Sequence, residues 1–210
     1  NCKVFDNGVE FKSHIDGTKH FFTPEKVIDI QKAFGSDIMM QLDECVPYPC
    51  DKQTAEKAME KTFAWAKISK NYPLDEDAQT IYGIIQGSTF KDLRKRSAEE
   101  ITSLGFKGYG IGGLSVGEPQ EVMFEMLDAI HPYLPDNAPR HLLGVGYPQD
   151  ILGAAKFGMD TFDCVIPTRE ARHRKLYIWK KDPQNSLPPQ GWKAKWKAKF
   201  YESIYIESGK

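Results

Sequence analysis

Residues 81–114 begin with Ile81-Tyr-Gly-Ile-Ile-Gln-Gly87, continue through Phe90 to Leu104, and end with Gly108-Tyr-Gly-Ile-Gly-Gly-Leu114. The first run is short and apolar and is rich in β-branched residues, which is typical of a buried strand. The middle segment has the spacing of a helix, and the last run is a second strand that enters a glycine-rich loop. A strand, a helix and another strand in this order predict a parallel βαβ unit.

The same alternation continues on both sides of this unit. Further strands are predicted at 38–42, 141–145 and 161–166, and further helices at 54–72, 120–130 and 148–157. Five βα units in a row indicate a parallel sheet wrapped by helices, either a closed barrel or a doubly wound sheet. We favour a (β/α)8 TIM barrel that is incomplete here, with about five βα units after an N-terminal β-hairpin.

The two ends of the chain depart from the alternation. Residues 9–16 and 19–22 alternate apolar and polar side chains around Gly17, which predicts the hairpin, and Thr23-Pro24 is a helix start. After residue 180 the pattern is lost in a proline-rich stretch that leads into the basic run 192–199. We therefore expect a partial TIM-barrel catalytic domain over 1–180 and a basic C-terminal segment of uncertain structure over 181–210.

Composition is that of a globular domain. The 210 residues are 40% hydrophobic and 27% charged, and no run approaches the roughly 18 apolar residues that cross a bilayer, so we expect a cytoplasmic protein without membrane contact. The four cysteines form no Cys-x-x-Cys pair, so reduced thiols and no metal site are expected. The net charge of −1 argues against indiscriminate polyanion binding, but residues 169–199 are strongly basic and could hold nucleic acid.

Polar groups and glycines stand where the predicted strands end: Asp43-Glu44-Cys45, Gln86-Gly87, Gly112-Gly113-Leu114, Gly144-Val-Gly146 and Asp163. In a parallel barrel these carboxyl ends converge on the active site. A carboxylate, a glutamine amide and a bare backbone strip suit a purine-like base. Each also has a structural interpretation, since Asp43 could cap a helix, Gln86 could bond backbone, the glycines could form a turn and Cys45 could be buried.

The stretch Asp160-Thr-Phe-Asp-Cys-Val-Ile-Pro-Thr-Arg-Glu-Ala-Arg172 follows the last unit. Its apolar run, which breaks at Pro167, predicts a buried strand. Asp163 emerges beside Arg169 and Arg172. Carboxylates serve as covalent nucleophiles on sugar carbons, and arginine grips phosphate through a planar fork. The alternative is an aspartate packed at a strand end next to a solvated basic loop.

Six motifs together resemble the bacterial type of tRNA-guanine transglycosylase, also called queuine tRNA-ribosyltransferase, in that family's order. They are Ser13-His-Ile-Asp-Gly17, Gly35-Ser-Asp-Ile-Met-Met-Gln-Leu-Asp-Glu-Cys45, Gly83-Ile-Ile-Gln-Gly87, Gly110-Ile-Gly-Gly-Leu-Ser-Val-Gly-Glu118, Leu143-Gly-Val-Gly146 and Phe162-Asp-Cys-Val-Ile-Pro-Thr-Arg169. The resemblance covers about residues 9–172. It implies a TIM-barrel transferase that exchanges guanine at wobble position 34 of tRNAs with GUN anticodons (Asp, Asn, His and Tyr types) in queuosine biosynthesis.

The resemblance also implies roles for individual residues. Asp163 would attack the ribose and form a covalent aspartyl-ribose intermediate, while Arg169 and Arg172 would hold anticodon-loop phosphates. The base, guanine or 7-aminomethyl-7-deazaguanine (preQ1), would be bound by Asp43, Cys45, Gln86, Gly113, Leu114 and Met159. Cys45 together with Val116 resembles the branch that takes preQ1.

The chain also departs from the family's pattern. The Asp-Ser-Gly-Gly motif, which supplies a second catalytic aspartate, would precede Asn1, and the Cys-x-Cys-x-x-Cys…His zinc site is not in this sequence. We therefore expect no cofactor in this chain. Separately, the resemblance implies a homodimer, which is the usual state of the family. The alternatives to an active enzyme are an inactive fragment, a non-catalytic tRNA-binding partner subunit, or a different TIM-barrel enzyme acting on a nucleotide or sugar.

Overall fold

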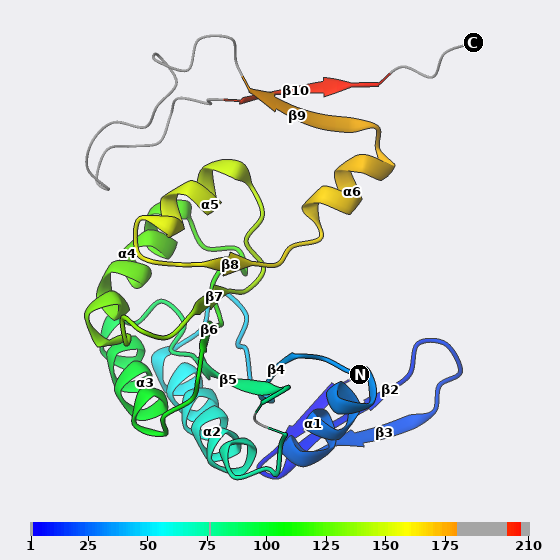
Figure 1. Cartoon of the computed structure of the whole chain (residues 1–210), viewed down its shortest axis with the longest axis vertical. Helices are drawn as coiled ribbons and strands as arrows, with labels where there is room; N and C mark the ends of the chain where they lie inside the picture. The colour runs from blue at the N-terminus through cyan, green and yellow to red at the C-terminus, as the bar shows by residue number, and fades with distance from the viewer. Residues whose placement is uncertain (1, 76, 180–200, 207–210) are drawn as a thin grey trace.

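The computed structural model describes residues 2–75, 77–179 and 201–206, and a parallel sheet forms its centre (Figure 1). The five strands pair in sequence order, and they are β4 (Ile38–Met40), β5 (Thr80–Ile85), β6 (Tyr109–Ile111), β7 (Arg140–Leu142) and β8 (Thr161–Phe162). The sheet curls into part of a barrel, with the helices on its outer side. This arrangement confirms the incomplete (β/α)8 barrel that the sequence predicts.

The helices follow the strands as predicted. They are α1 (Pro24–Ala33), α2 (Lys52–Lys70), α3 (Lys91–Ser103), α4 (Gln120–Ile130) with the short 3-10 turn η1 (His131–Tyr133), and α5 (Pro148–Ala155). The Thr23 hydroxyl accepts from Lys26 N at the start of α1, and Asp51 accepts from Thr54 N at the start of α2. Asp51, and not Asp43, therefore caps α2, so Asp43 does not have the helix-capping role that was the alternative for it.

The core lies between the sheet and these helices. Ile85, Ile111 and Leu142 are fully buried on three neighbouring strands, and Ile101 of α3 and Leu127 of α4 pack against them in one cluster. Burying side chains of this size contributes roughly 1.5–3 kcal/mol each, so the barrel segment has a continuous apolar core of its own. This core fixes the strand ends and therefore the site that is built on them.

A small antiparallel sheet precedes the barrel strands. The predicted hairpin is formed by β2 (Gly8–Lys12) and β3 (Lys19–Phe22), and β1 (Cys2–Phe5) adds a third strand to it. The buried Trp65 of α2 donates its indole N–H to Asp6 O at 2.7 Å. This hydrogen bond ties the small sheet to the helical layer.

The prediction of a buried strand over residues 161–166 is wrong. β8 ends at Phe162, its residues are exposed or half-buried, and Ile166 begins a helix, α6 (Ile166–Arg172). Pro167 lies in the first turn of α6, where its missing N–H would have no partner in the helix and its fixed φ is favourable. The proline therefore starts a helix here, and Arg169 and Arg172 lie on that helix.

An unpredicted hairpin follows α6. β9 (Lys175–Trp179) pairs antiparallel with β10 (Tyr201–Tyr205), which lies within the segment expected to be separate from the barrel domain. The basic run 192–199 lies outside the described residues. Over the part of the chain that the structure describes, no helix is long and apolar enough to cross a membrane.

Candidate active site

Asp43 and Gln86 lie next to each other at the carboxyl ends of β4 and β5. The Gln86 side-chain amide donates from Nε2 to Asp43 Oδ2 at 2.6 Å, and Gln86 N donates to Ser97 Oγ of α3 at 3.0 Å. Gln86 is only 2% exposed. Burial raises the pKa of the Asp43 carboxyl, and the hydrogen bond from Gln86 opposes that rise. The pair is a fixed polar edge that combines a carboxylate with an amide.

The glycine strip after β6 packs directly against this pair. A Cβ added at Gly112 or Gly113 would lie closer than 3.0 Å to the Gln86 amide, and Gly113 has a φ of +65°. Both features require glycine at Gly113, because a side chain would displace the amide and strain the backbone. Leu114 is 3% exposed and its side chain belongs to the apolar core, and Gly112 and Gly113 are buried as well.

A buried arginine that the sequence analysis missed holds this strip in place. Arg94 of α3 is fully buried and donates from Nη1 to Gly112 O at 2.7 Å and from Nη2 to Gly113 O at 2.9 Å. It also donates to the carbonyls of Ile85 and Ser88. Desolvation lowers the pKa of Arg94 to about 10, and the Glu118 charge acts the other way, so the guanidinium remains charged at neutral pH.

The sequence contained a signal for Arg94. It lies four residues before Ala98 and seven before Ile101, and these two apolar side chains are buried on the inner face of α3. The neighbouring Lys95 and Arg96 make the position look like part of a solvated basic face. Helical spacing, which places Arg94 with the apolar residues, was the informative feature.

Cys45 belongs to the same neighbourhood but is exposed, so it is not the small buried residue of the alternative interpretation. Partial desolvation of the thiol raises the pKa of Cys45, and so does the nearby negative charge of Asp43. The positive charge of Arg94 and a hydrogen bond from Gly113 N lower that pKa. The Gly113 N–H therefore points toward the Cys45 sulfur. Asp43, Cys45, Gln86 and Gly113 thus form one cluster, which we call the base-edge cluster.

Glu118 organises the loop that follows the glycine strip. One carboxylate oxygen accepts from Ser115 N, and the other accepts from Val116 N at 3.0 Å. Ser115 has a positive φ of 59°. The two bonds from one carboxylate hold this strained turn in a single conformation.

Asp163 follows β8 directly, and its side chain is 63% exposed. Its Oδ1 accepts from Gly144 N at 3.1 Å and lies 3.0 Å from His141 Nε2. Both contacts end on Oδ1, and within the described part of the chain Oδ2 has no such partner. The carboxylate is therefore held by one oxygen and accessible at the other.

One hydrogen bond connects the surroundings of Asp163 to the glycine-rich loop. Ser115 Oγ donates to Gly144 O at 3.1 Å, and Gly144 N is the group that donates to Asp163. The loop after β6 and the loop after β7 are thereby joined. The structure thus brings Asp163 and the base-edge cluster to the same edge of one sheet.

The remaining candidate residues lie elsewhere. Arg169 and Arg172 are exposed on α6, and Arg169 Nε is 3.9 Å from a Glu170 oxygen. Met159 is 3% exposed, belongs to the core and precedes β8, so it lies toward the amino ends of the strands. The structure therefore does not bring Met159 to the edge that carries Asp163 and Gln86.

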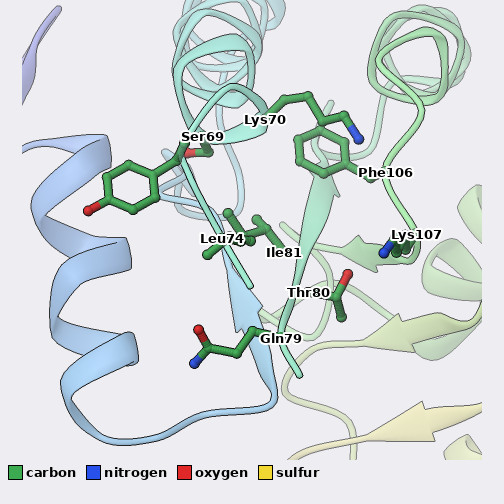
Figure 2. Close-up of a pocket in the computed structure, with 9 residues that line it drawn as sticks. Ser69, Lys70, Leu74, Gln79, Thr80, Ile81, Phe106 and Lys107 are labelled. Atoms are coloured by element: carbon green, nitrogen blue, oxygen red, sulfur yellow. The ribbon is translucent and has the colours of Figure 1, made fainter. Parts of the chain in front are cut away.

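A cavity of about 40 Å³ lies at the opposite end of the sheet, near the start of β5 (Figure 2). Thr80, Phe106 and Ser69 are among the residues that line it, and the Ser69 hydroxyl is buried without a hydrogen-bond partner in the described residues. A space of this size holds a few water molecules at most, whereas drug-sized ligands occupy roughly 300–1,000 Å³. It does not compete with the carboxyl-end site for a nucleobase.

The resemblance implies that Asp43 binds guanine, and on that basis Asp43→Asn is expected to weaken guanine binding and to stabilise the fold at neutral pH. The neutral amide loses a charged acceptor for base N–H groups, which lowers guanine affinity roughly 10- to 100-fold by isothermal titration calorimetry. Because folding raises the pKa of Asp43, the native state holds more protons than the unfolded state once the pH rises above the ordinary aspartate range. The carboxylate therefore lowers stability as pH rises, up to its raised pKa.

Urea unfolding of the two proteins between about pH 4 and pH 8 tests this sign. The unfolding free energy of Asp43→Asn minus that of the original protein should grow with pH and then level off. A difference that is constant over this range, or that shrinks as pH rises, would contradict a buried carboxylate at this position.

Comparison with known proteins agrees with this geometry. The family model described as queuine tRNA-ribosyltransferase matches residues 1–202. Three relatives of the same name come from Symbiobacterium thermophilum, Caldanaerobacter subterraneus subsp. tengcongensis and Aquifex aeolicus, with 53%, 52% and 55% identity. The matches cover 84%, 83% and 83% of this chain but 44%, 47% and 47% of the relatives, so the chain spans about half their length. The chain belongs to the queuine tRNA-ribosyltransferase family.

Proposed function

We propose that this chain carries the base-exchange site of a tRNA-guanine transglycosylase. The observation that supports this most directly is Asp163, an exposed carboxylate held through one oxygen at the sheet edge that also carries Asp43 and Gln86. A nucleophile for the sugar and a polar edge for the base are the two elements that such an exchange needs. The substrate would be guanine at position 34 of tRNAs with GUN anticodons.

In this mechanism Asp163 Oδ2 attacks the ribose anomeric carbon, a C–O bond forms, and the C–N bond to guanine breaks. The electron pair of that bond leaves with guanine, which takes up a proton. The ring nitrogen of the incoming base, deprotonated as it attacks, then displaces the carboxylate and restores an N-glycosidic bond. One glycosidic bond replaces another, so the exchange needs no net input of redox or phosphate energy.

The base-edge cluster would bind guanine and then preQ1. The Asp43 carboxylate would accept from base N–H groups, Gln86 would contribute its amide, and the backbone of Gly113 and Leu114 would meet the base directly. Cys45 and Val116 would line the wall that admits the aminomethyl group of preQ1. Met159 is not assigned to this pocket, because it lies toward the other end of the sheet.

Arg169 and Arg172 would hold phosphates of the anticodon loop. They are three residues apart on α6, so they share one face of the helix, and both are exposed. Their planar forks can each take a phosphate in bidentate fashion. The proposal further includes a cytoplasmic homodimer that acts on tRNAs of the Asp, Asn, His and Tyr types, with no cofactor bound by this chain.

Incubation of the full-length protein carrying this chain with radiolabelled guanine and unmodified tRNA tests the proposal. Label should enter a GUN-anticodon transcript and should not enter the same transcript with position 34 changed to adenosine. Binding of tRNA without exchange would instead indicate a non-catalytic partner subunit. Exchange on free guanosine would indicate a different barrel enzyme.

A further inference from the structure

His141 contacts Asp163 directly, and none of the roles described above uses it. The imidazole lies on β7, with Nε2 at 3.0 Å from Asp163 Oδ1 and Nδ1 at 2.8 Å from Thr161 Oγ1 of β8. The His141 side chain is 15% exposed, whereas that of Asp163 is 63% exposed. A largely buried ring therefore supports a largely exposed carboxylate.

The two contacts fix the protonation of the ring nitrogens. A carboxylate can only accept, so Nε2 must carry the proton that lies between the ring and Asp163. In the neutral ring Nδ1 is then an acceptor, and the Thr161 hydroxyl is its donor. Thr161 thereby orients the ring in the tautomer that donates to Asp163, and both strands contribute to the arrangement.

Gly144 N completes the arrangement from a second direction. Its hydrogen bond of 3.1 Å ends on the same oxygen, Oδ1, as the contact from His141. Two donors on one oxygen fix the rotation of the carboxylate about its side-chain bonds. The other oxygen, Oδ2, then has a defined direction, which is what attack on a sugar carbon requires.

We propose that His141 is a positioning residue that aims the Asp163 carboxylate at the anomeric carbon. The inference rests on the proposed function and deepens it by assigning a residue that acts through the nucleophile. His141 touches neither the base-edge cluster nor the arginines of α6 through any contact described above. Its loss should therefore slow the chemical step and leave substrate binding nearly unchanged.

The test compares His141→Phe and His141→Gln in the full-length protein. Phenylalanine keeps the ring volume and removes the donor, so kcat for guanine exchange should fall roughly 10- to 100-fold while KM for tRNA changes less than about twofold. Glutamine can place its Nε2 amide near the former ring nitrogen and should recover most of that loss. Thr161→Val, which frees the tautomer, should give a smaller loss of kcat.

His14→Phe serves as the matched control, because His14 is exposed in the turn between β2 and β3. Its kcat and KM should equal those of the unmodified protein. If the protein exchanges guanine and His141→Phe has the same rate as this control, the positioning role of His141 is overturned and the proposed function still stands. Equal losses in His141→Phe and His141→Gln would also overturn it, because they would show that the site needs the ring and not the donor.

A second measurement does not depend on activity. The His141 Nε2 proton should give a downfield, slowly exchanging ¹H NMR signal that disappears in His141→Phe and also in Asp163→Ala. Persistence of that signal in Asp163→Ala would overturn the contact itself. If the signal behaves as expected but no variant exchanges guanine, the proposed function fails while the hydrogen bond stands.

Discussion

Asp163→Asn is expected to reduce guanine exchange at least about 10³-fold, because an amide oxygen is a far weaker nucleophile than a carboxylate. The fold should barely change. Asp163 is 63% exposed, and the Asn amide oxygen can still accept from Gly144 N, so the unfolding free energy should shift by about 0.5 kcal/mol or less. Guanine affinity should also persist, because Asp43 and Gln86 are untouched.

Three measurements on one preparation separate these effects. Single-turnover exchange gives the chemical rate, denaturing gels show whether a covalent tRNA adduct forms, and calorimetry gives guanine affinity. Asp128→Asn is the matched control, because Asp128 is an exposed aspartate on α4. An adduct that still forms in Asp163→Asn at the original rate would assign the nucleophile to another residue.

Gly113→Ala is expected to give the second largest effect, a loss of guanine affinity of roughly 100-fold or more. The new methyl would overlap the Gln86 amide oxygen, and Gln86 is buried and bonded to Asp43. The amide can move aside only by giving up that bond, so the base-edge cluster would lose its arrangement. Stability should fall by about 2–3 kcal/mol, which combines left-handed backbone strain with the clash.

Gly105→Ala isolates the steric part of this prediction. Gly105 has a φ of +66°, nearly the same as the +65° of Gly113, but a methyl group added there would meet no atom within 4 Å. The unfolding free energy of Gly105→Ala, measured in urea, should fall only by the cost of left-handed backbone strain, about 1 kcal/mol. This variant should keep full guanine affinity. Equal stability losses in the two variants would contradict the close packing of Gly113 against Gln86.

The sheet could be predicted from the sequence because a local pattern of residues marks each of its strands. Apolar runs such as 81–85 end abruptly in glycine or polar residues, and a helical stripe follows each one. The chain order of these runs is also the spatial order of the strands, since each connection leads to the neighbouring parallel strand. The side chains that follow the strands therefore shared one edge as predicted, which brought Asp43 and Gln86 together.

Contacts between distant segments were less predictable. The run 163–166 has strand propensity, but the strand ends early and α6 begins, because Pro167 suits a first helical turn as well as a strand end. Arg94 was hidden among other basic residues of α3, and only its four backbone partners, in the two separate segments 85–88 and 112–113, reveal its role. His141 is recognisable only once β7 and β8 are paired, since Asp163 is twenty-two residues away in the chain.

The bonds from Arg94 also fix the direction of the peptide groups in the glycine strip. In a planar trans peptide the N–H points opposite to the C=O, and the Gly112 and Gly113 carbonyls both face the guanidinium. The amide hydrogens of Gly113 and Leu114 therefore face away from it, and the buried positive charge polarises them as donors. Under the proposed function, we therefore expect the site to bind a purine that presents an oxo group to the Leu114 N–H more tightly than a purine that presents an amino group there.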